Sequence, residues 1–180
     1  MPHSKKNGLG ILGGSFDPPH IGHLKISKIS LKKLKIKKVY WVLTRRNPFK
    51  KKPFYSMKER LLRCEKLIKN SKNIEVVYLE NKIKSSRTIN VLNHFKKHKN
   101  KKDLYLIIGS DNLIDFHKWK SWKKIAKMVK LVVFSRKGYD KKGKVSIVVK
   151  HLNKKNIFFV KNKKINISSS EIKKRNYKNK

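Results

Sequence analysis

Two histidines and a run of glycines are the residues of this sequence best suited to phosphate chemistry. They lie in the string Gly13-Gly14-Ser15-Phe16-Asp17-Pro18-Pro19-His20-Ile21-Gly22-His23. Glycines allow the backbone to turn tightly and to approach a phosphate group closely. His20 and His23 are three residues apart, so at the start of a helix both imidazoles share one face beside the N-terminal amides of that helix. A lone histidine there would more often cap the helix, but the pair suits a pentavalent phosphorus centre.

Short apolar runs must form the strands that position this string. Six of them recur along the chain: Leu9 to Leu12, Val39 to Leu43, Ile74 to Leu79, Leu104 to Ile108, Leu131 to Phe134 and Ile157 to Val160. Helical spacing separates most of them, as in Leu24, Ser27 and Leu31, or after Ser56, where Glu59 completes a capping box. Strands that alternate with helices predict an α/β fold with a doubly wound, mostly parallel, Rossmann-like sheet. Ligands of such sheets bind beyond the carboxyl ends of the strands.

The length of 180 residues suits a single globular domain, residues 1–180. Residues 1–7 and 176–180 are expected to be frayed tails, and the stretch from Lys137 to Lys144 is expected to be a surface loop. No apolar run approaches membrane-spanning length, and no secretory signal is visible. The one cysteine, Cys64, cannot form an intramolecular disulfide and is expected to be a buried thiol. We therefore expect a cytoplasmic protein without a membrane partner.

Basic residues dominate the composition. The 50 lysines and arginines outnumber the 10 acidic residues, which gives a formal net charge of +40. Such an excess attracts phosphate backbones and raises the hypothesis of nucleic-acid binding. The lysines are spread along the whole chain, as drift toward AT-rich codons would produce, whereas a binding footprint clusters on one face or segment. We therefore expect no specific nucleic-acid partner.

Four segments of the chain resemble a known family. The string from Gly13 to His23 resembles the signature of the nucleotidylyltransferase superfamily, whose H-x-G-H element binds ATP phosphates. Three later segments are similar, in order and spacing, to the bacterial type of nicotinate mononucleotide adenylyltransferase. They are Asn47-Pro48-Phe49-Lys50, then Gly109-Ser110-Asp111-Asn112-Leu113 followed by Phe116, His117, Trp119 and Trp122, and last Ile167-Ser168-Ser169-Ser170-Glu171-Ile172-Lys173.

The reaction implied by this resemblance is adenylyl transfer. A nucleotidyltransferase of this family joins ATP to nicotinate mononucleotide and gives nicotinate adenine dinucleotide and pyrophosphate, a step of NAD biosynthesis. No covalent enzyme intermediate is needed, so alignment of the two phosphates and electrostatic stabilisation would supply the catalysis. Mg²⁺ is the expected cofactor, bound mainly to ATP oxygens and water, and no protein metal site is expected because few acidic residues lie near the motifs.

The resemblance also implies roles for individual residues. His20 and His23 would be the catalytic pair, stabilising the charge that moves from the α-phosphate to the departing pyrophosphate. The expected ATP-binding residues are Gly13, Gly14, Ser15, Phe16, Lys50, Gly109, Asp111, Ser168, Ser169, Ser170 and Lys173. The expected pyridine-nucleotide-binding residues are Thr88, whose backbone would meet the carboxylate, Trp119, which would stack on the ring, and Trp122.

Structural alternatives stay open for several of these residues. Asp111 and the serines at 168–170 are also suited to capping a helix. Trp119 and Trp122 are also suited to core packing.

The chain departs from the usual residues of the family at three positions. Histidine is common where Phe49 stands, tyrosine where Arg87 stands, and arginine where Lys173 stands. Lys173 keeps the charge but lacks the bidentate fork, for which Arg175 would compensate. The acceptor also stays open: nicotinamide mononucleotide or phosphopantetheine are alternatives to nicotinate mononucleotide, and a basic nucleic-acid-binding protein is a remote alternative. The oligomeric state stays open as well.

Overall fold

A computed structural model describes residues 8–34, 36–46, 52–98, 103–152, 155–161, 169 and 172–173, so the predicted tails lie outside the described residues. The strands are β1 (Gly8–Gly14), β2 (Ile36–Leu43), β3 (Ile74–Tyr78), β4 (Leu104–Gly109), β5 (Lys130–Phe134) and β6 (Ile157–Val160). The helices are α1 (Ile21–Lys33), α2 (Met57–Ile68), α3 (Glu80–Ile83), α4 (Thr88–His98), α5 (Ser110–Asp115), the 3₁₀ helix η1 (Phe116–Lys118), α6 (Trp122–Met128), α7 (Asp140–Lys144) and α8 (Ile147–Leu152). Each predicted apolar run is a strand, which confirms those six predictions.

The six strands form one sheet in the order β3-β2-β1-β4-β5-β6, and every neighbouring pair is parallel. The chain builds β1, β2 and β3 outward in one direction and then returns to place β4 on the other side of β1. The direction of winding therefore reverses between β1 and β4, and doubly wound sheets bind ligands in the crevice at this switch point. The predicted doubly wound, Rossmann-like α/β fold is confirmed.

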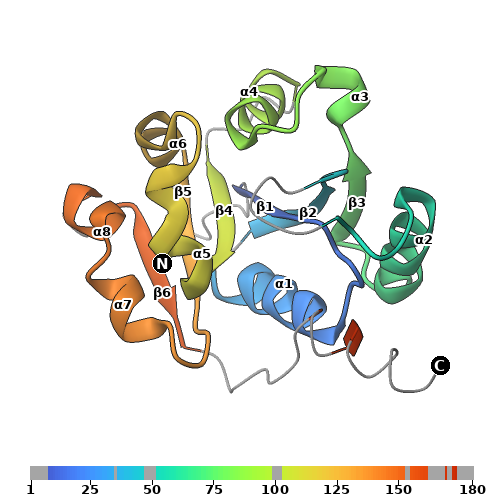
Figure 1. The fold of residues 1–180 in the computed structure, drawn as a ribbon, viewed down its shortest axis with the longest axis horizontal. Helices are drawn as coiled ribbons and strands as arrows, with labels where there is room; N and C mark the ends of the chain where they lie inside the picture. The colour runs from blue at the N-terminus through green and yellow to red at the C-terminus, as the bar shows by residue number, and fades with distance from the viewer. Residues whose placement is uncertain are drawn as a thin grey trace, which may run out of the picture.

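The sheet has a buried layer of side chains on each face. Figure 1 shows the strands between α1 below and α4 above. Leu92 of α4 belongs to one core cluster, whereas Leu24 of α1 and Cys64 of α2 belong to the other. The strands serve both layers because their side chains alternate: Ile11 belongs to the first cluster and Leu12 to the second. In the described part of the chain, no helix is long and apolar enough to cross a lipid bilayer.

Helix α2 begins and packs as its sequence predicts. Ser56 Oγ accepts a hydrogen bond from the Glu59 backbone N–H at 3.2 Å, and Glu59 Oε2 accepts one from the Ser56 backbone N–H at 2.8 Å. This confirms the capping box. Cys64 is fully buried, as predicted, and desolvation raises the pKa of its thiol to about 12.

The prediction of a surface loop from Lys137 to Lys144 is wrong for its second half, which forms α7. The Asp140 carboxylate anchors the start of this helix. It accepts hydrogen bonds from Ser110 Oγ at 2.7 Å, from the Arg136 backbone N–H at 2.9 Å and from Ser135 Oγ. These contacts tie α7 to the ends of β4 and β5, so long-range anchoring overrides the loop-like composition.

Candidate active site

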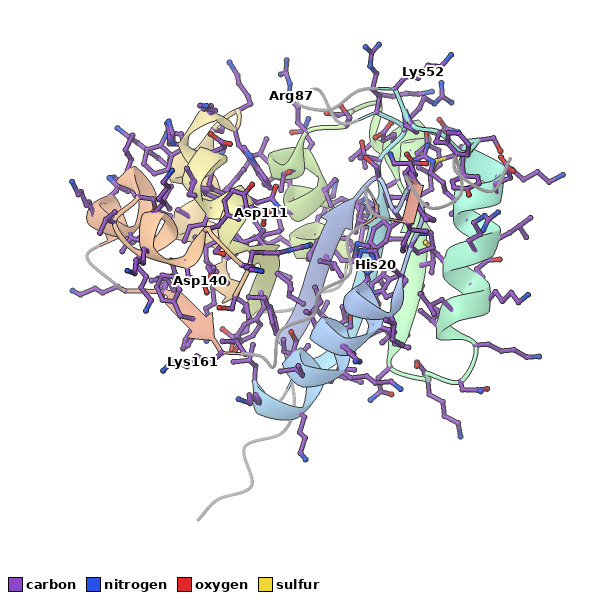
Figure 2. All side chains as sticks on the ribbon, turned by 60° about the horizontal axis from the view of Figure 1, so that its bottom comes forward. His20, Lys52, Arg87, Asp111, Asp140 and Lys161 are labelled. Carbon is purple, nitrogen blue, oxygen red and sulfur yellow. The ribbon has the colours of Figure 1, made fainter. Side chains whose placement is uncertain are left out.

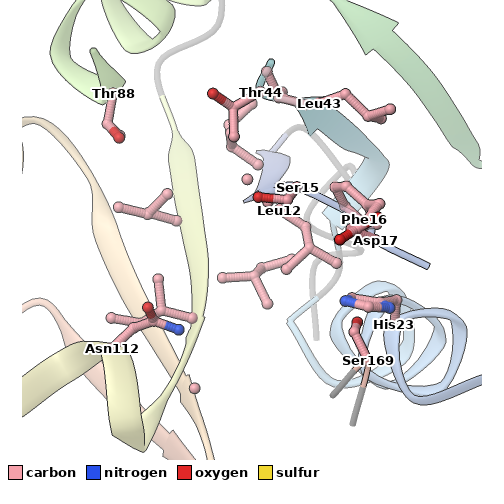
Figure 3. Close-up of a pocket in the computed structure, with 18 of the residues that line it drawn as sticks. Leu12, Ser15, Phe16, Asp17, His23, Leu43, Thr44, Thr88, Asn112 and Ser169 are labelled. Atoms are coloured by element: carbon pink, nitrogen blue, oxygen red, sulfur yellow. The ribbon is translucent and has the colours of Figure 1, made fainter. Parts of the chain in front are cut away.

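A cleft of about 880 Å³ opens at the carboxyl ends of the strands, at the switch point between β1 and β4. Most of the predicted site residues that the structure describes line it: Gly13, Gly14, Ser15, Phe16, His20, His23, Thr88, Gly109, Asp111, Trp119, Ser169 and Lys173. In Figure 3, His23 and Ser169 lie at one end of this cleft and Thr88 lies at the other. Residues that are up to 160 positions apart in the chain thus meet in one cavity.

The two histidines cap α1 through the same ring nitrogen. Nδ1 of His20 accepts a hydrogen bond from the Gly22 backbone N–H at 3.1 Å, and Nδ1 of His23 accepts one from the His20 backbone N–H at 3.2 Å. A ring nitrogen that accepts a hydrogen bond carries no proton, so the proton of each neutral imidazole is on Nε2. The ring centroids are 3.9 Å apart, and both rings line the cleft. The pair therefore brings two Nε2 donors close together.

Aromatic packing fixes the position of His23. The Phe16 ring centroid lies 4.8 Å from that of His23 and 5.1 Å from that of Trp41, on which it stacks. Ser27 Oγ donates to the His23 carbonyl oxygen and accepts from Trp41 Nε1, both at 2.8 Å. The backbone of Phe16 has a φ of 47°, a left-handed conformation that is rare for a bulky residue and typical of functional loops. Phe16 thus packs against the histidine, a contact that its position in the sequence did not show.

Asp17 organises the loop before the histidines. Its side chain is only 5% exposed and accepts hydrogen bonds from the backbone N–H groups of Phe54 and Tyr55 and from Lys173 Nζ, each at 2.9 Å. Burial alone would raise the pKa of this carboxyl, but these hydrogen bonds and the Lys173 charge outweigh it, so the pKa lies below its ordinary value. Sequence reasoning missed this role, because the partners are distant in the chain.

The last motif of the sequence reaches the same loop. Ser169 Oγ donates a hydrogen bond to the Pro18 carbonyl oxygen at 2.8 Å, and Lys173 pairs with Asp17. The predicted ATP-site residues Lys50, Ser168 and Ser170, and the positions of interest Phe49 and Arg175, lie outside the described residues.

Arg60 of α2 is a second residue that sequence reasoning missed. Its side chain is 2% exposed, and all three of its hydrogen bonds go to backbone carbonyl oxygens. Nη1 donates to Ser15 at 2.7 Å and to Thr44 at 2.8 Å, and Nη2 donates to Arg45 at 3.1 Å. Desolvation lowers the pKa of this guanidinium, against the opposing charge of Asp17. The only signal in the sequence was an arginine on the helix face that also carries Cys64.

At the end of β4, the carboxylate of Asp111 lies very close to the backbone of Gly109. A Cβ atom at Gly109 would collide with Asp111 Oδ1 and lie 3.2 Å from Arg136 Cγ, so only glycine fits without displacing them. The N-cap residue of α5 is Gly109, and Asp111 lies in the first turn of this helix. Asp111 is therefore not the N-cap residue, so the capping alternative is not observed. Asp111 Oδ1 is buried without a hydrogen-bond partner in the described part of the chain, and Arg136 Nε lies 3.9 Å away. Such an acceptor suits a donor group of a ligand.

Of the two tryptophans predicted to bind the pyridine nucleotide, only Trp119 lines the cleft. Trp119 lines the cleft, as Thr88 does, and also packs on Phe116, with ring centroids 4.9 Å apart. Trp122 does not line the cleft. It packs against the core and meets the His151 ring edge-on at 4.9 Å, as the core-packing alternative predicted.

The sequence of this chain is similar to those of known proteins. Residues 11–175 match the sequence model of the Cytidylyltransferase-like family. A protein of Pelagibacter ubique (strain HTCC1062), named "Probable nicotinate-nucleotide adenylyltransferase", is 44% identical over 172 residues, which cover 96% of this chain and 95% of that protein. The chain belongs to the nicotinate-nucleotide adenylyltransferase family. This confirms the resemblance seen in the sequence.

Other members of the nicotinate-nucleotide adenylyltransferase family are also similar. A Campylobacter fetus protein of the same name is 43% identical over 131 residues, with 71% of each chain covered. The solved structure of "Plasmodium falciparum nicotinic acid mononucleotide adenylyltransferase complexed with NaAD" has a TM-score of 0.75 and 23% identity, and the match covers 93% of this chain and 83% of that one. At this identity the structural match supports the shared fold.

Proposed function

We propose that this chain transfers the adenylyl group of ATP to nicotinate mononucleotide, forming nicotinate adenine dinucleotide and pyrophosphate. The observation that carries the proposal is the His20 and His23 pair, whose Nδ1 atoms are committed to the backbone and whose Nε2 atoms are therefore donors. The pair lines a cleft of about 880 Å³, at whose other end Thr88 lies (Figure 3). The family membership of the chain supports the same reaction.

The chemistry is an in-line displacement at phosphorus. A 5′-phosphate oxygen of nicotinate mononucleotide attacks the α-phosphorus of ATP, and the bond from that phosphorus to the bridging oxygen of pyrophosphate breaks. Negative charge grows on the leaving group and on the α-phosphate oxygens. His20 and His23 donate hydrogen bonds to this charge, which stabilises the transition state more than the bound substrates.

We assign ATP to the part of the cleft at the ends of β1 and β4. Gly13 leaves open space, since a Cβ there would meet no atom within 4 Å, so a phosphate group fits against its backbone. Asp111 Oδ1, which lacks a hydrogen-bond partner among the described residues, accepts from the nucleotide. Lys173 adds positive charge beside the phosphates while Asp17 holds its side chain.

The pyridine side is assigned to Thr88 and Trp119. Trp119 stacks on the ring, and this contact treats an acid and an amide alike. Backbone N–H groups near Thr88 donate to a carboxylate through charge-assisted hydrogen bonds, whereas the NH₂ of an amide would confront another donor. Arg87 also lines the cleft and adds positive charge. We therefore assign the acid as the preferred acceptor.

Mg²⁺ is assigned to the triphosphate of ATP. Among the described residues, no group of three or more His, Cys, Asp or Glu side chains is arranged to hold a metal ion. Mg²⁺ is commonly held by phosphate oxygens, waters and at most one or two carboxylates, so this cleft fits an ion that arrives with ATP. The ion would neutralise phosphate charge. Both ATP and Mg²⁺ are abundant in the cytoplasm, where we place the reaction.

A panel of acceptors tests this proposal. Pyrophosphate release from ATP is measured with nicotinate mononucleotide, nicotinamide mononucleotide and phosphopantetheine. The expected result is a kcat/KM for the acid at least about tenfold above that for the amide, a difference of about 1.4 kcal/mol, and no reaction with phosphopantetheine. Equal use of acid and amide would contradict the account of Thr88, and preferred use of phosphopantetheine would overturn the proposed acceptor.

A further inference from the structure

Arg60 is a buried cation that has no described carboxylate in direct contact, although the charges of Asp17 and Glu80 act on it. Within the described parts of the chain, it forms no ion pair, and its Nε has no hydrogen-bond partner. Removing a charge from water is costly when no opposite charge is in contact with it. Cys64, one helical turn later, shows that this face of α2 accepts a small apolar side chain. The cost of burying this charge must therefore be offset by the hydrogen bonds that the guanidinium donates.

The carbonyl oxygens that Arg60 binds belong to two segments that border the cleft. Ser15 directly follows β1 and begins the loop that leads to the histidines, whereas Thr44 and Arg45 directly follow β2. A backbone hydrogen bond from Thr44 N–H to the Gly14 oxygen at 3.0 Å joins the same two segments. A guanidinium is planar and rigid, so one side chain that binds both segments sets the distance between them.

We propose that Arg60 is a positioning residue for adenylyl transfer, holding the loop at Ser15 in the place where its backbone meets the ATP phosphates. This inference rests on the proposed function. Arg60 does not line the cleft and would not touch the substrate, so it acts only through the Ser15, Thr44 and Arg45 backbones. A displacement of about 1 Å in an aligned reaction can lower its rate about a hundredfold.

Kinetics of Arg60→Lys and Arg60→Met test this role. Lysine keeps the charge and part of the hydrogen bonding, whereas methionine removes both. The expected kcat falls at least about tenfold in Arg60→Met and by a smaller factor in Arg60→Lys, and KM for ATP changes less than kcat in each. The matched control is Cys64→Ala, on the same helix face and without hydrogen bonds to the loop. It should unfold at a lower temperature and keep the kcat of the wild type.

Hydrogen exchange of the substrate-free protein provides a second readout. Peptides that cover residues 14–16 and 44–46 should exchange faster in Arg60→Lys than in Cys64→Ala at equal overall stability, because only the first variant loosens the carbonyl anchors. If Arg60→Met does not fold, Arg60→Lys decides the question. Wild-type kcat in the Arg60 variants, or equal exchange in Arg60→Lys and Cys64→Ala, would overturn the inference. A wild-type protein without pyrophosphate release would instead refute the proposed function, and the exchange comparison would still decide whether Arg60 holds the loop.

Discussion

His20 and His23 each accept a backbone hydrogen bond at Nδ1 at the start of α1, and the proposed reaction assigns Nε2 of each as a donor to phosphate. Asparagine Oδ1 occupies nearly the same position as histidine Nδ1 and is favoured at helix N-caps. His20→Asn and His23→Asn should therefore keep the acceptor that caps α1 and remove the Nε2 donor. We expect each variant to lower kcat roughly tenfold to a thousandfold, with smaller changes in KM, in steady-state assays of pyrophosphate release.

His151→Asn is the control for these variants, since His151 contacts Trp122 and does not line the cleft. Its kcat should equal that of the wild type. Unfolding midpoints near that of the wild type would show that the cap survives in the two cleft variants. Near-normal kcat in both cleft variants would contradict the proposal that His20 and His23 are transition-state donors.

Asp17 should make folding stability depend on pH. Burial raises the pKa of this carboxyl, but hydrogen bonds from Tyr55, Phe54 and Lys173 bring it below the ordinary value of 3.8. A carboxyl with a lowered folded-state pKa adds stability above its unfolded pKa, and this stability is lost as pH falls through the folded pKa. Urea unfolding between pH 7 and acid should show the wild type losing free energy of unfolding below about pH 4. Asp17→Asn should be less stable at pH 7 and lose less over the same range. Parallel curves for the two proteins would exclude this linkage.

The sequence placed together residues that are close in the chain and missed contacts between distant segments. His20 and His23 share a helical turn, so their spacing alone placed them together. Asp17 meets Lys173 across 156 positions and Arg60 meets Ser15 across 45, and no local pattern encodes such pairs. Trp122 shows a related limit, because a short motif does not reveal which face of the next helix meets the cleft.

At the scale of elements, the junction of β4 and α5 depends on a glycine. Gly109→Ala adds a methyl group that collides with Asp111 Oδ1 and lies 3.2 Å from Arg136 Cγ, so both side chains must shift. We expect KM for ATP to rise roughly tenfold to a hundredfold, the range for losing a hydrogen bond to a charged group of about 1.5–3 kcal/mol. Isothermal titration with a non-hydrolysable ATP analogue, alongside kinetics, measures the effect.

Asp111→Ala is the matching variant, because Gly109→Ala is argued to act by displacing that carboxylate. The two variants should weaken ATP binding by similar factors, and the double variant should be no worse than either. Additive losses in the double variant would show that Gly109 acts by another route.

Elements were predictable where local signals are strong. Six apolar runs marked the strands, and Ser56 with Glu59 marked the start of α2. Helix α7 was missed because its five residues, Asp140–Lys144, are mostly basic and include a glycine. Its start is held by contacts of Asp140 with residues after β4 and β5, which act only once the sheet has formed.

For the whole molecule, the net charge of +40 predicts binding to polyanions that is not the function. Lys52 and Lys161 lie at opposite edges in Figure 2, which illustrates a charge that is spread and not gathered on one face. Binding to unrelated RNA and DNA should therefore be equal in affinity and should weaken steeply with salt, because it depends on counterion release. Fluorescence anisotropy at two ionic strengths measures this. A sequence preference that persists at physiological salt would support the alternative that this chain is a nucleic-acid-binding protein.

Alternation of strands and helices was enough to predict a doubly wound parallel sheet, but the shape of the cleft was not predictable. The cleft depends on how the loops after β1, β2, β4 and β5 meet, and residues such as Asp17, Arg60 and Asp140 fix these loops through contacts between distant segments. The sequence could therefore predict the edge of the sheet where the cleft opens, but not the residues that hold the loops around the cleft.

Transfer of isotope from ATP shows directly whether this protein moves an adenylyl group. The wild-type protein is incubated with nicotinate mononucleotide, Mg²⁺ and ATP labelled with ³²P at either the α- or the γ-phosphate. Direct adenylyl transfer predicts that α-label appears in nicotinate adenine dinucleotide, that γ-label appears in pyrophosphate, and that no label stays on the denatured protein. Label that is retained covalently on the protein, or α-label that never reaches the dinucleotide, would contradict direct adenylyl transfer in this cleft.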